Sequence, residues 1–138
     1  ITHAASDCTS RQTVRNVLDG HARGVFQGKV LVERIAQKTD GYQMNQALLL
    51  SPDAEIDAKP ELEIYADDVR CSHGATVGAL DDDQLFYLRS RGIPAHDARQ
   101  ILIDAFLDEA IALVVDATAQ TFCRAVLAAR FAGKGEGA

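Results

Sequence analysis

The residues of this chain with the clearest chemical potential are Cys71 and His73, two positions apart in the run YADDVRCSHGATVG (65–78). Alternate residues of a β-strand project from the same face, so on a strand the sulfur and the imidazole would point the same way. A thiolate and an imidazole are suitable ligands for zinc or iron. A closed structural zinc site needs four ligands. Any metal here would therefore need further ligands, either from acids such as Asp67 and Asp68 or from another chain.

The same spacing allows two other interpretations of Cys71 and His73. One is a buried cysteine beside a hydrogen-bonded histidine, which the spacing alone favours. The other is a nucleophile and its base, which would also require a third, orienting group and an oxyanion hole. The pattern leaves these alternatives open.

A row of acids suggests a different chemistry, because paired carboxylates can act as acid and base on sugars. Glu55, Asp57, Glu61 and Glu63 alternate with apolar residues. That alternation is also the ordinary appearance of a strand with one solvated face. A β-helical carbohydrate-active enzyme is thus an alternative function, which two carboxylates about 5–10 Å apart in a cleft would favour.

The elements that would position these side chains change type near Gly78. Residues 1–79 contain short runs of strand-like alternation, such as the one holding Val30 and Val32. Pro60 cannot donate to a β-ladder, so it marks a corner or an edge strand. Short strands with turns at their corners predict either a sandwich or a coil of stacked parallel strands.

The segment 80–131 has helical signals. Asp81 and Gln84 have the spacing of a capping box, and Gly92 is well placed just beyond the last turn. The helix between them carries a candidate partner-binding surface, because arginine and aromatic residues are common interface anchors. Its residues are Leu85, Phe86, Tyr87, Arg89 and Arg91.

A second helix is expected to open at Pro94, a favourable first-turn residue. Its predicted apolar stripe is Ala98, Ile101, Leu102, Ala105 and Phe106. We expect a break near 116–118, a third helix over 120–130, and a disordered glycine-rich tail over 132–138.

Composition narrows the function further. The net charge is −6, and residues 53–83 hold ten acids against two bases. Such an acidic surface repels phosphate backbones, so we expect no nucleic-acid partner. No run of about 18 apolar residues is present, so we expect no membrane association. Three widely spaced cysteines form no disulfide framework and fit a reducing, cytoplasmic setting. The chain begins at Ile1, which we interpret as a piece of a longer protein.

Two long runs resemble a known family. KPELEIYADDVRCSHGATVG (59–78) and FYLRSRGI (86–93) are similar to the C-terminal third of the SufD-like branch of the SufB/SufD family, which belongs to the SUF iron–sulfur cluster assembly system. The resemblance extends from about Ile1 to Ile111. It implies a mainly β plus α protein, a truncated right-handed parallel β-helix over 1–79 followed by a C-terminal helical domain over 80–131.

The resemblance also implies a scaffold role rather than an enzyme. By this resemblance, SufD-like members pair with SufB through the β-helix and bind the ATPase SufC through the C-terminal helices. The histidine of the motif, here His73, is a proposed ligand for iron or a nascent cluster at the SufB interface, with Cys71 beside it. We therefore expect a transient cluster or iron shared with a partner subunit, and none bound tightly by this chain alone. Exposed strand ends would also allow a self-dimer.

Overall fold

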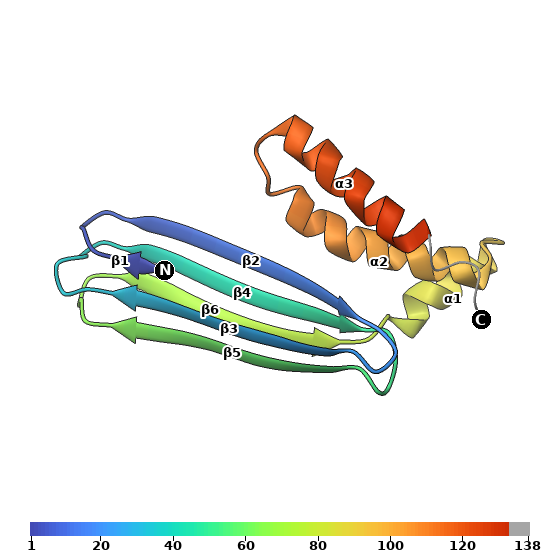
Figure 1. The fold of residues 1–138 in the computed structure, drawn as a ribbon, viewed down its shortest axis with the longest axis horizontal. Coiled ribbons are helices and arrows are strands. Elements are labelled where there is room, and N and C mark those ends of the chain that lie inside the picture. The colour runs from blue at the N-terminus through green and yellow to red at the C-terminus, as the bar shows by residue number, and fades with distance from the viewer. Residues whose placement is uncertain (133–138) are drawn as a thin grey trace. The chain divides into compact units, whose positions relative to one another are not determined.

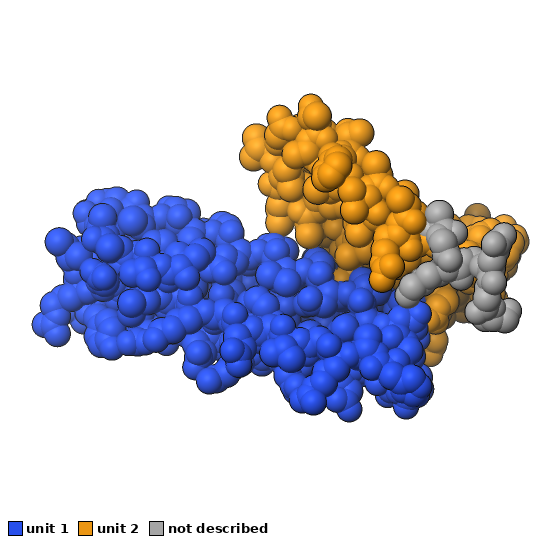
Figure 2. Space-filling model, viewed as in Figure 1, with its two compact units in different colours: residues 1–80 blue, residues 81–138 orange. Residues whose placement is uncertain are grey.

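The computed structural model describes residues 1–132, which fall into two compact units. We call residues 1–80 the β unit and the described residues from 81 to 132 the helical unit (Figure 2). Apart from residue 132, the tail for which disorder is expected lies outside the described residues.

The β unit consists of strands that run parallel in two sheets (Figure 1). One sheet has the order β1-β3-β5 and the other β2-β4-β6, so each strand pairs with the strand two further along the chain. The strands are β1 (Thr2–His3), β2 (Thr9–Leu18), β3 (Arg23–Val32), β4 (Asp40–Leu49), β5 (Glu55–Ile64) and β6 (Arg70–Gly78). Successive strands therefore alternate between the two sheets.

The expectation of short strands is wrong. β2 to β5 have ten residues each, and Pro60 lies inside β5 rather than between two strands. Of the two positions expected for this proline, the structure shows the edge, because β5 is the outermost strand of its sheet. Pro60 is in register with Gly28 of β3.

The core of the β unit combines apolar and polar side chains. Val30, Val32, Ala36 and Ala66 form a buried cluster against which Cys71 also packs. On β4, however, the wholly buried side chains include the amides of Gln43 and Asn45. Buried amides require hydrogen-bond partners. β4 therefore places hydrogen-bonding side chains in the interior of the β unit.

The helical unit contains α1 (Asp82–Ser90), α2 (Ala95–Ile111) and α3 (Ala117–Ala132). The predicted cap is confirmed, since the Asp81 carboxylate accepts a hydrogen bond from the Gln84 amide at 2.8 Å. Gly92 follows α1 at a φ of +87°, the left-handed conformation that glycine favours. In the described residues, none of the helices combines the length and apolar character needed to cross a membrane.

The rest of the helical prediction needs two adjustments. The break falls before Asp116, whose carboxylate accepts from the Ala119 amide at 2.7 Å and so caps α3. The buried residues of α2 are Ala98, Ile103 and Ile111, whereas Ile101 of the predicted stripe is exposed. The predicted stripe is therefore confirmed in part, since Ala98 is buried and Leu102 and Phe106 are half-buried.

Candidate functional site

Cys71 and His73 lie on the same face of β6, as their spacing predicts. They are in register with Gly41 and Gln43 of β4, which are both buried and face the interior between the two sheets. In-register residues of neighbouring parallel strands share a face, so both side chains project from the interior face of the sheet. β6 is the last strand of this sheet in the described residues.

The two side chains differ in their surroundings. Cys71 is half-buried and packs against the apolar cluster around Val32, which agrees with the cysteine part of the interpretation as a buried cysteine beside a hydrogen-bonded histidine. His73 is exposed. The pair is thus an accessible imidazole next to a sheltered thiol, both on an edge strand.

Glycine leaves room for the thiol. A Cβ added at Gly41 would lie 3.2 Å from Cys71 Sγ and 3.7 Å from Ser10 Oγ. Ser10, Gly41 and Cys71 are in register across β2, β4 and β6. The absence of a side chain on the middle strand therefore allows the sulfur to occupy the interior.

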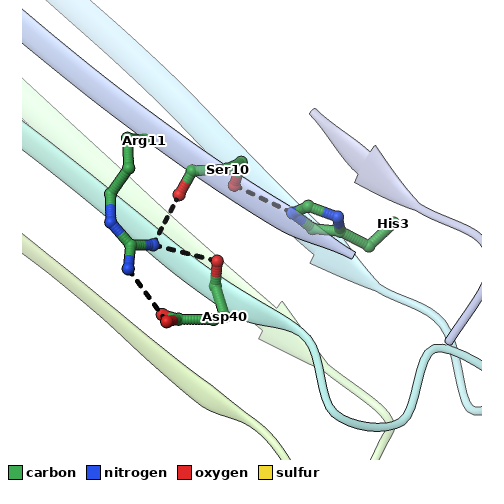
Figure 3. Close-up of polar contacts among 4 residues, drawn as sticks. All are labelled: His3, Ser10, Arg11 and Asp40. Carbon is green, nitrogen blue, oxygen red and sulfur yellow. Dashed lines mark hydrogen bonds and ion pairs between the residues drawn. The ribbon is translucent and has the colours of Figure 1, made fainter. Parts of the chain in front are cut away.

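Polar contacts near the beginning of β2 connect this strand to its neighbours (Figure 3). The buried His3 ring contacts Ser10 Oγ through Nε2 at 2.9 Å. On the other face of β2, the Arg11 guanidinium binds the Asp40 carboxylate at 2.9 Å and lowers the pKa of that carboxyl. These contacts link β2 to β1 and to β4 beside the strand that carries the cysteine.

Two glutamine side chains precede the histidine in one row across the sheet. Gln12, Gln43 and His73 are in register on three neighbouring strands. Gln43 Nε2 donates to Gln12 Oε1 at 3.2 Å. Sequence reasoning missed both glutamines, because alternation on β4 would place the larger apolar residues Tyr42 and Met44 inside. The signal that could have revealed Gln43 is that it shares the phase of Gly41 on β4.

Metal ligands are incomplete in this region. In residues 1–132, no group of three or more His, Cys, Asp or Glu side chains is arranged to hold a metal ion. Asp67 and Asp68, considered as additional ligands, lie in the segment before β6 and are exposed. The arrangement therefore offers an imidazole and a thiol as donors, and further donors would have to come from outside the β unit.

The acidic row lies on the solvated face of β5. Asp57 forms an ion pair with Arg23 at 2.6 Å, and Glu61 with Lys59 at 3.1 Å. Glu63 pairs with Lys29, whose hydrogen bond lowers the pKa of that carboxyl. Carboxylates held by neighbouring bases favour the solvated-face interpretation over acid–base chemistry on sugars.

The candidate partner surface on α1 is largely open. Phe86 and Tyr87 are 74% and 55% exposed, and Arg89 and Arg91 are also exposed. The Arg91 guanidinium lies 5.1 Å from the centre of the Tyr87 ring. Leu85 is half-buried. Four of the five predicted residues are thus accessible to a partner.

A groove of about 550 Å³ separates α2 from α3. Its lining includes Asp108 and Arg124, which form an ion pair at 2.6 Å across the two helices. This pair lowers the pKa of Asp108. Part of the lining of this groove comes from α3, which lies beyond the resemblance that ends at about Ile111. The α1 surface lies within it.

The described residues thus form a two-sheet parallel β unit with a Cys-Ser-His motif on its last strand, followed by helices. The chain belongs to the SufBD family, because residues 1–106 match the family described as "SUF system FeS cluster assembly, SufBD core domain". It is 52% identical over 109 residues to the iron-sulfur cluster assembly protein SufD of Escherichia coli, which covers 79% of this chain and 26% of that protein.

Two further relatives are similar to this chain over a comparable share of its length. The chain is 52% identical over 100 residues to the SufBD family protein slr0076 of Synechocystis, covering 72% of the chain and 22% of that protein. It is 47% identical over 104 residues to the chloroplastic protein ABCI7 of Arabidopsis thaliana, covering 74% and 22%. The chain spans about a quarter of the length of these curated relatives.

Proposed function

We propose that this chain is part of a scaffold subunit in iron–sulfur cluster assembly, in which His73 and Cys71 form half of a binding site for iron or a nascent cluster. The observation that carries the proposal is the placement of two metal-ligand side chains on one face of an edge strand. A partner at that edge would supply the remaining ligands. In this function the chain assembles a site and is not an enzyme by itself.

The strands are proposed to belong to a right-handed parallel β-helix. Every pairing in the β unit joins a strand to the next but one, as in a coil whose turns stack. The connection from β3 through β4 to β5 is a crossover between parallel strands, and such crossovers are right-handed in about 98% of cases. Further turns of the same coil could stack on the exposed edges.

The edge of β6 is the proposed contact with a SufB-type subunit. In the described residues β6 pairs only with β4, so its other side presents unpaired backbone groups. Such an edge is a template for strand addition, and main-chain hydrogen bonds would hold the partner strand. A strand added there would lie next to His73. A second copy of this chain could occupy the same position, giving a self-dimer.

The surface of α1 is the proposed contact with a SufC-type ATPase. An exposed phenylalanine and tyrosine beside exposed arginines form the kind of cluster that dominates binding energy in many interfaces. Phe86→Ala and Arg89→Ala should each weaken capture of SufC in a cytoplasmic assembly and leave capture of SufB unchanged. Arg130→Ala, an exposed arginine on α3, is the matched control. Unchanged SufC capture by the first two variants would reject this surface.

The half-site is tested by His73→Ala in the complete complex with SufB and SufC. We expect assembly of the complex to be retained and the yield of cluster to fall about tenfold or more, because a lost metal ligand cannot be replaced by solvent with the same geometry. Thr76→Ala, on the opposite face of β6, is the control. If the His73 variant builds clusters as the wild type does, the half-site is wrong and only the scaffold role remains.

A further inference from the structure

Gln43 is a polar residue in the interior of the β unit, where apolar side chains are usual. It lies in the middle of β4 and is wholly buried. The opposite sheet makes space for it, because a Cβ added at Gly28 would lie 2.6 Å from Gln43 Nε2. The β unit therefore contains a place shaped for this amide in its interior.

Only half of that amide has a partner. Its Nε2 donates to Gln12 Oε1, while Gln43 Oε1 is buried and has no hydrogen-bond partner in residues 1–132. The bond to Gln12 uses the nitrogen, which leaves the carbonyl oxygen free to accept. A buried acceptor without a donor is unfavourable, so its retention calls for an explanation.

Two register neighbours of Gln43 carry side-chain donors: Gln12, whose Nε2 is also buried without a hydrogen-bond partner in the described residues, and His73. Gln43 is the neighbour of Gln12 on one side and of His73 on the other. The hydrogen bond between the two glutamines shows that inward side chains one strand apart in this sheet reach each other. His73 is likewise one strand away from Gln43, on the side opposite Gln12.

We infer that Gln43 is a positioning residue for His73: its Oε1 accepts a hydrogen bond from one ring N–H and leaves the other ring nitrogen to coordinate iron. Metal-binding histidines generally donate their second ring N–H to an oxygen, which fixes the tautomer and the ring orientation. Gln12 in turn holds the Gln43 amide in place. The inference rests on the proposed function of His73 as a ligand, and it adds the group that prepares the ligand.

The chain itself provides the direct test. In ¹⁵N-labelled protein we expect a protected ring N–H resonance, assigned to His73 by its loss in His73→Ala. Gln43→Met keeps the length of the side chain without a carbonyl oxygen, and should abolish that resonance. Asn45→Leu is the matched control, because Asn45 is also wholly buried on β4 but is in register with Ala75. It should lower stability without altering the His73 signal.

A second readout uses the complex with SufB and SufC loaded with ferrous iron. We expect Gln43→Met to weaken iron binding about 10- to 100-fold, the usual effect of removing such a partner, and Asn45→Leu to leave it unchanged. A His73 ring resonance that is absent from the wild type, or identical in Gln43→Met, would overturn the inference even if His73→Ala abolishes cluster assembly. Conversely, normal assembly by His73→Ala would reject the ligand role while the Gln43–His73 contact could still be observed.

Discussion

Cys71 Sγ lies 3.2 Å from the position that a side chain on Gly41 would occupy. The two residues are in register on neighbouring strands, so the glycine is what allows the thiol to face the interior. This relationship makes the cysteine position sensitive to a change on a different strand.

We predict that Gly41→Ala destabilises the β unit. The sulfur must move by a few tenths of an ångström, and overpacking of this kind costs about 1–3 kcal/mol. Gly78→Ala is the matched control, because a Cβ there meets nothing within 4 Å. That control should gain about 0.4–1 kcal/mol from the lower entropy of the unfolded chain. Urea unfolding measures both, and Cys71→Ala should relieve the loss in Gly41→Ala. Equal stability of the two alanine variants would contradict the prediction.

Gly28 should be as intolerant of an added side chain as Gly41, although different side chains surround it. An added methyl group would lie 2.6 Å from Gln43 Nε2 and 2.7 Å from Phe26 Cζ. We expect Gly28→Ala to lower the free energy of unfolding by about 1–3 kcal/mol. A double-mutant cycle with Gln43→Ala should show that the two changes are coupled. Additive effects would mean that the amide does not occupy the space that the glycine leaves.

The cap of α1 gives a prediction for the helical unit. Asp81→Ala removes the acceptor for the Gln84 amide and should cost about 0.5–2 kcal/mol of helix stability. Asp81→Asn keeps a side-chain oxygen at the same position and should remain close to the wild type. Circular dichroism during thermal unfolding distinguishes the two variants. Equal loss in both would assign the effect to charge at the helix terminus rather than to the hydrogen bond.

The ion pair between α2 and α3 should make the helical unit sensitive to acid. Arg124 lowers the pKa of Asp108 in the folded state. The pair therefore stabilises the fold at neutral pH, and this contribution is lost as the pH falls through the lowered pKa. Because both side chains are about half exposed, the effect should be small.

Asp108→Asn measures that contribution. The variant should unfold at a lower urea concentration than the wild type at neutral pH, and at the same concentration once Asp108 of the wild type is protonated. Asp104→Asn is the control, because Asp104 accepts a hydrogen bond from Gln100 instead. A stability difference between Asp108→Asn and the wild type that persists unchanged in acid would show that the ion pair is not its cause.

Features set by neighbouring residues could be predicted from the sequence. The shared face of Cys71 and His73 follows from the two-residue repeat of a strand, and the cap at Asp81 follows from its spacing to Gln84. Both depend only on backbone geometry over a few residues. The structure confirms them.

Features that depend on packing against strands distant in the sequence could not be predicted from local patterns. Gln43 is buried because Gly28 faces it from the other sheet, and no local pattern carries that information. Likewise, β5 continues through Pro60 because its pairing partner is β3, although the proline resembles a boundary. Parallel strands joined by long connections lack the tight turns that identify a hairpin, so their length and phase depend on tertiary packing.

The proline in β5 gives β5 and β6, the last strands of the two sheets in the described residues, unequal capacity to pair with another chain. Proline in a sheet is tolerated where its nitrogen faces away from the ladder, so an incoming strand would find a missing donor halfway along β5. β6 contains no proline and offers an uninterrupted row of amides. Under the proposed strand addition, β6 is therefore the more favourable edge, and strand addition at β5, which could join chains end to end, is disfavoured.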